Sequence, residues 1–92
     1  MKLWLLSQDV NNDYDTYDSC VVVEQTAEEA KRLHPNGILR ANEEGKFEYP
    51  YCSAWVNSDW VKRVENINAK YIGEADSDLK AGDVICASYN AG

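Results

Sequence analysis

The sequence has no apolar run long enough to cross a membrane. Its opening stretch holds four apolar residues in a row, residues 3–6, whereas a spanning helix needs about 20. Four residues are also too few for the apolar region of a signal peptide. These absences predict a soluble, cytoplasmic protein without a membrane partner.

Basic residues are also scarce. The 92 residues include 9 Lys and Arg against 16 Asp and Glu, for a formal net charge of -7. A chain without a basic stripe lacks the charges that bind phosphates, so we expect no direct nucleic-acid binding. Residues 3–30 hold seven acidic side chains and no basic one. These acids either form a solvated surface that maintains solubility or form a patch that attracts a basic partner.

Metal-ligand patterns are missing as well. The three cysteines and one histidine are too widely spaced for a zinc site, which usually contains close ligand pairs such as CxxC. The acidic segment that begins at Asp9 imitates the start of a calcium loop, but it lacks the central glycine and has Cys20 where the loop needs Glu. We therefore predict no metal and no cofactor.

The cysteines and the histidine have simpler explanations. Cys20 and Cys86 lie in apolar segments, where a thiol behaves as a small hydrophobic group. His34 directly precedes Pro35 at the expected end of a helix, where a cation is favourable. A nucleophilic pair of Cys52 and His34 remains the alternative, and it would make the protein a small enzyme.

The chain length predicts a single domain, residues 1–92. Apolar and β-branched runs predict four strands, over residues 2–8, 19–25, 66–73 and 84–89. The last strand is expected inside the sheet, because its faces are mixed. Thr26 and Glu29 match a capping box, and Pro35 should end the helix of about nine residues that follows. The order β-β-α-β-β predicts an α+β fold, a small antiparallel sheet with one helix packed on a face.

The segment before the third strand is an irregular insert rich in aromatic residues. Five aromatic residues lie within fourteen positions: Phe47, Tyr49, Tyr51, Trp55 and Trp60. Large rings there form either a lid over the core or an anchor for a partner. If the acidic and aromatic features both serve binding, the partner-binding residues are Asp9, Asp13, Tyr14, Asp15, Tyr17, Asp18, Tyr49, Tyr51, Trp55 and Trp60.

Both ends of the chain resemble a known group of proteins. The N-terminal part contains MKLWLLSQ, YDTYDS, VVV, EEA and HP in this order, and the C-terminal part contains YIGEA and GDVICASYNAG. These motifs cover about two thirds of the chain and are similar to a family of short uncharacterised proteins encoded by bacteriophages and prophages. The resemblance implies no reaction, because the family has no established activity. Residues 38–51 are longer than the family pattern, so the resemblance does not extend to a role of the insert.

A phage origin implies a bacterial host cell as the location and a host protein as a partner. Small acidic phage proteins without catalytic motifs commonly inhibit host defence systems such as CRISPR effectors and restriction enzymes. We therefore expect a non-enzymatic accessory protein that inhibits a host or phage protein by occluding its basic surface. The alternatives are the small enzyme and a self-associating module, in which the strand at residues 84–89 or 2–8 completes a sheet between subunits.

Overall fold

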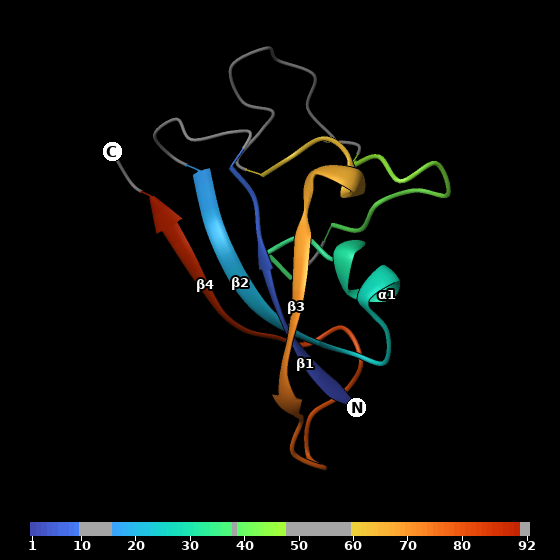
Figure 1. Ribbon diagram of the computed structural model, residues 1–92, viewed down its shortest axis with the longest axis vertical. Helices are drawn as coiled ribbons and strands as arrows, with labels where there is room; N and C mark the ends of the chain where they lie inside the picture. Colours follow the sequence, from blue (N-terminus) through green and yellow to red (C-terminus); the bar gives the residue numbers. More distant parts are fainter. Residues whose placement is uncertain (10–15, 38, 48–59, 91–92) are drawn as a thin grey trace.

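The computed structural model describes residues 1–9, 16–37, 39–47 and 60–90 of the chain (Figure 1). Their elements are β1 (Lys2–Ser7), β2 (Thr16–Glu24), α1 (Ala27–Lys31), η1 (Val64–Asn66), β3 (Asn68–Glu74) and β4 (Val84–Asn90). The prediction of a small antiparallel sheet with one short helix is confirmed. Most of the predicted aromatic insert, residues 48–59, lies outside the described residues.

The four strands are hydrogen-bonded in the order β3-β1-β2-β4, and every neighbouring pair is antiparallel. The apolar β1 therefore lies between β2 and β3. β4 lies at an edge of the sheet, so the expectation of an interior place for residues 84–89 is wrong. A mixture of apolar and polar side chains on both faces is also compatible with an edge strand, whose side chains have fewer neighbours.

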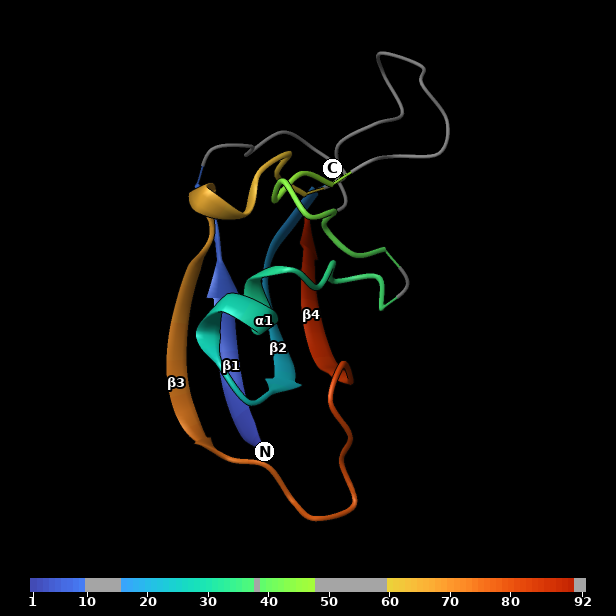
Figure 2. The ribbon, with the colours of Figure 1, turned by 90° about the vertical axis from the view of Figure 1, so that its right-hand side faces the viewer.

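The core lies on one face of the sheet, and α1 is in front of this face in Figure 2. Leu6 and Cys20 are opposite each other in the β1–β2 register, and both are buried. Ala30 of α1 and Trp60 belong to the same apolar cluster. Since burying large apolar side chains is the main stabilising contribution in so small a domain, this single cluster holds α1 on the sheet.

The predicted N-cap of α1 at Thr26 is confirmed. The backbone N–H of Glu29 donates to Oγ1 of Thr26 over 3.2 Å, and Thr26 has the extended backbone of an N-cap. The helix is nevertheless only five residues long instead of about nine. It ends early because the next residues pair with the chain that follows: Leu33 forms an antiparallel bridge with Arg40. The N–H of His34 donates to the carbonyl of Leu39 over 3.1 Å.

β2 begins at Thr16, three residues before the predicted start at residue 19. This extension lies beyond the end of β1 and pairs with β4. Thr16 is opposite Asn90, and Tyr17 is opposite Tyr89. The connection between the first two strands is correspondingly shorter than predicted, and Asp18 lies within β2. Among the residues that the structure describes, no helix is long and apolar enough to cross a membrane.

Candidate interaction surface

Three predicted partner-binding residues and one further residue lie at the end of the sheet where β1 ends and β2 begins. We call this surface the acidic end and define it as Asp9, Tyr17, Asp18 and Tyr89. Both acids are exposed. The N–H of Gln8 donates to the carbonyl of Asp18 over 3.4 Å, and its side-chain Nε2 donates to the carbonyl of Tyr17 over 3.0 Å. Because Gln8 is itself buried, these bonds hold the two acidic positions at a defined place relative to the sheet.

Tyr89 is the functional candidate that sequence reasoning missed. Its ring centre lies 4.8 Å from that of Tyr17, and the residue is 47% exposed. Tyr17 contacts His34 edge to face, with ring centres 5.8 Å apart. The aromatic contacts thus run from the buried His34 through Tyr17 to the exposed Tyr89. The sequence could have pointed to Tyr89 only through its position opposite Tyr17. That position depends on the pairing of β2 with β4, two segments that are far apart in the sequence.

Three of the predicted partner-binding residues belong to the acidic end: Asp9, Tyr17 and Asp18. Six others lie outside the described residues: Asp13, Tyr14, Asp15, Tyr49, Tyr51 and Trp55. The prediction for Trp60 is wrong, because its side chain is completely buried in the core. For this residue, the structure agrees with the alternative of a ring that covers the core, since a fully enclosed indole has no surface with which to contact a partner.

His34 is also different from the prediction. It is completely buried, and its Nδ1 accepts a hydrogen bond from the N–H of Asn36 over 3.0 Å. Phe47 and Trp60 lie edge to face against its ring, with ring centres at 5.9 and 6.5 Å. Because α1 ends at Lys31, His34 does not lie at the end of the helix, where it was predicted. Cys52, its predicted partner in a nucleophilic pair, lies outside the described residues.

The described acids of residues 3–30 fall into two groups. Asp9 and Asp18 lie at the acidic end. Glu24 is the last residue of β2, at the other end of that strand, and Glu29 is in α1. Burial is the main cause that raises the pKa of the Glu24 carboxyl, and the nearby Glu29 raises it further. The charge of Arg40 acts in the opposite direction. The described acids of residues 3–30 therefore do not form one continuous patch, and Glu24 lies in a different environment from Asp9 and Asp18.

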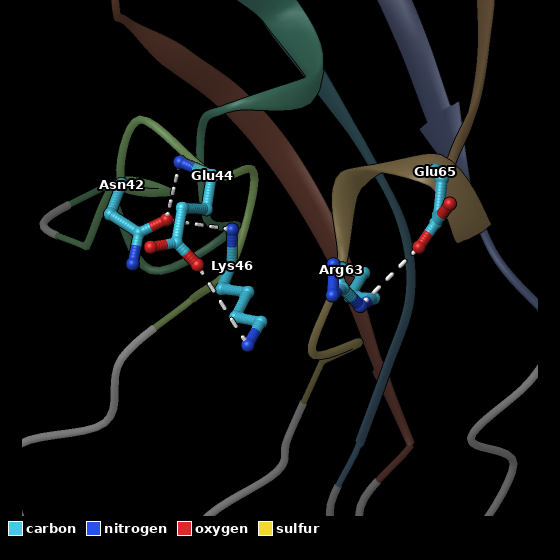
Figure 3. A network of polar contacts seen from close by, with 5 residues as sticks. All are labelled: Asn42, Glu44, Lys46, Arg63 and Glu65. Carbon is cyan, nitrogen blue, oxygen red and sulfur yellow. Dashed lines mark hydrogen bonds and ion pairs between the residues drawn. The ribbon is translucent and has the colours of Figure 1, made fainter.

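A shallow depression of about 380 Å³ lies beside α1, lined by Glu28, Lys31, Arg32, Glu43, Glu44, Gly45, Val64 and Glu65. Figure 3 shows how its margin is held: Oδ1 of Asn42 accepts bonds from the N–H groups of Glu44 and Lys46 at 2.9 and 3.0 Å. Lys46 is 3.9 Å from the carboxylate of Glu44. The depression thus mixes acidic and basic side chains, and ion pairs at exposed positions contribute little. We assign no ligand to it.

The two described cysteines have opposite environments. Cys20 is buried as predicted, and burial raises the pKa of its thiol to about 12, with a smaller contribution from Cys86. Cys86 is exposed on β4, so the prediction that it is a buried small hydrophobe is wrong. Over residues 1–9, 16–37, 39–47 and 60–90, no group of three or more His, Cys, Asp or Glu side chains is arranged to hold a metal ion.

Comparison of the chain with protein-family models, with curated proteins and with solved structures finds no match.

Proposed function

We propose that the protein is a non-enzymatic phage accessory protein that binds a basic surface of a host protein and inhibits that protein by occlusion. The observation that carries this proposal is the acidic end, where two exposed carboxylates and the exposed Tyr89 lie at the same end of the sheet. Acids attract a basic surface over a distance, and tyrosine side chains provide much of the contact energy once the surfaces meet. The sequence resemblance to phage and prophage proteins supports the choice of a bacterial host protein, within the cytoplasm of that cell.

The mechanism requires no bound cofactor. Many basic protein surfaces bind nucleic acid, and carboxylates that cover such a surface compete with phosphates for the same Lys and Arg side chains. Tyr17 supports the contact from behind, because it lies between the buried His34 and Tyr89. A ring that is already packed loses little conformational freedom on binding. An inhibitor of defence enzymes, such as CRISPR effectors or restriction enzymes, would act in this way.

The proposal extends to the predicted residues that lie outside the described ones. Asp13, Tyr14 and Asp15 fall between Asp9 and Asp18 in the sequence, and we propose that they also take part in binding the partner. Tyr49, Tyr51 and Trp55 would contribute further rings. For the whole chain we propose the order β-β-α-β-β, with the aromatic-rich insert before the third strand.

The test compares two charge reversals of equal size. One variant carries Asp9→Lys and Asp18→Lys at the acidic end. The control carries Asp76→Lys and Asp78→Lys, two exposed positions in the connection between β3 and β4, which lies at the opposite end of the sheet (Figure 2). Both variants change the net charge by the same amount. Immobilised wild type and variants are exposed to lysate of a bacterial host, and the captured protein is then purified and its affinity measured.

We expect one partner with a basic surface, bound by the wild type and by the control but at least about tenfold more weakly by the acidic-end variant. Its affinity should fall as salt rises, since salt screens exposed charges. The purified partner should also lose nucleic-acid binding when the wild type is added. Equal losses in both variants, or binding that is insensitive to salt, would contradict the electrostatic mechanism.

A further inference from the structure

The two edge strands of the sheet differ in how they are protected against pairing with another chain. Natural proteins commonly place charges on edge strands to prevent such pairing. β3 has Lys70 and Glu74, and the hydroxyl of Tyr71 donates to the Glu74 carboxylate over 3.0 Å. β4 has no charged residue between Val84 and Asn90. In a chain with 16 acids and 9 bases, seven neutral residues at an edge are a distinct feature.

β4 is also accessible along its length. In the part of the chain that the structure describes, it is paired on one side only, with β2. Alternate residues of an antiparallel strand direct their N–H and C=O groups to opposite sides, so part of the β4 backbone is directed away from β2. The five residues from Ile85 to Tyr89 are all exposed. Ile85 and Tyr89 are 46% and 47% exposed, as much as Tyr71 and Ile72 on the other edge strand, so what distinguishes β4 is its lack of charge.

We propose that β4 pairs antiparallel with β4 of a second copy of this chain, around a two-fold axis that passes beside Ala87. The basic partner of the proposed function would be attracted to acids, whereas the neutral β4 edge offers such a partner no charge complementarity. A second β4 is equally neutral. Two copies that each carry a net charge of -7 repel one another, and at the β4 edge their strands can meet without placing any charged side chains opposite each other.

The register around Ala87 is self-complementary. It places Cys86 opposite Ser88 of the second copy, and Ser88 opposite Cys86 of the second copy. It also brings Ile85 near Tyr89 of the second copy at both ends of the contact. Pairs of an aromatic and a β-branched side chain stabilise neighbouring antiparallel strands. The two sheets would then form one continuous sheet of eight strands, with a closed two-fold interface that does not propagate into a fibre.

Salt separates this inference from the proposed function. Attraction between the acidic end and a basic partner weakens as salt rises. Self-association brings two acidic molecules together, so screening should strengthen it. The failure of one prediction therefore leaves the other unaffected.

The first experiment measures the mass of the purified protein by sedimentation equilibrium over a wide concentration series, at low and at high salt. We expect a monomer–dimer equilibrium that shifts toward the dimer as salt rises. Ala87→Lys should reduce association at least about tenfold, because it places two cations side by side at the two-fold axis. Ala81→Lys is the matched control, since Ala81 is also exposed but lies outside the strand, and it should associate like the wild type.

The second experiment tests the register. In a Cys52→Ser background, Ser88→Cys should give a covalent dimer with oxidised glutathione, which accepts the two electrons released as two thiols form each disulfide. Directly opposite strand positions have a suitable separation for such a bond. Ser77→Cys in the same background is the control and should remain largely monomeric. A monomer at all concentrations, or equal association of Ala87→Lys and Ala81→Lys, would overturn the proposal. A dominant bond between the two Cys86 residues would overturn this register.

Discussion

Cys20 should react with an alkylating reagent far more slowly than Cys86 while the protein is folded. The thiolate is the reactive form of cysteine. Burial, helped by the proximity of Cys86, raises the pKa of the Cys20 thiol from 9.0 to about 12. This change lowers the thiolate fraction near neutral pH about a thousandfold, equivalent to about 4 kcal/mol.

Access adds to this chemical protection. Cys20 is only 2% exposed and lies in the core opposite Leu6, so the reagent must wait for the β1–β2 pair to open. Opening of core strands approaches the free energy of global unfolding, about 5 kcal/mol or more for an ordinary domain. Cys86 is exposed on an edge strand and needs no such opening.

The assay follows iodoacetamide labelling by mass spectrometry in two variants. Cys52→Ser with Cys86→Ser leaves only Cys20, and Cys52→Ser with Cys20→Ser leaves only Cys86. We expect the native Cys20 rate to be at least about a thousandfold below that of Cys86, and the two rates to converge in denaturant. Similar rates in the folded protein would refute the burial of Cys20, and with it the β1–β2 register that places this thiol in the core.

Two further predictions concern α1 and the end of β2. Thr26→Ala should destabilise the protein by about 1 kcal/mol in urea unfolding, because it removes the hydroxyl that accepts from the Glu29 N–H, whereas Thr26→Ser should retain most of the stability. Glu24→Gln tests the raised pKa of Glu24. A carboxyl whose pKa is higher in the folded state stabilises the fold at acid pH, and this contribution is lost as pH rises through the folded value. The variant should therefore gain stability relative to the wild type between acid and neutral pH, and a constant difference across this range would contradict the assignment.

Features that depend on neighbouring residues could be predicted from the sequence. The Thr26–Glu29 cap involves residues three positions apart, and the β-branched run in β2 favours a strand through the preferences of adjacent residues. Burial of Cys20 followed from the same run. These signals are local, so they can be interpreted without knowing which distant segments pack against them.

Features that depend on distant pairing could not be predicted. The start of β2 at Thr16 is set by its pairing with the end of β4, more than seventy residues later. The same pairing places Cys86 at an exposed edge and Tyr89 beside Tyr17. His34 looked like a helix-end cation, but the bridge between Leu33 and Arg40 ends α1 before it. In each case a tertiary contact overrides the local signal.

Tyr89 links the two proposed interactions. It belongs to the acidic end through its contact with Tyr17, and it belongs to β4, whose pairing with a second copy would bring Ile85 of that copy near its ring. One exposed ring cannot be covered by both partners, so a host protein bound at the acidic end should favour the monomer, and dimerisation should weaken host binding by the same factor. Because salt acts on the two interactions in opposite directions, the dimer would dominate at high salt and the complex at low salt. Host binding at the acidic end and pairing of the neutral edge would then be alternative uses of Tyr89, with salt and protein concentration deciding between them.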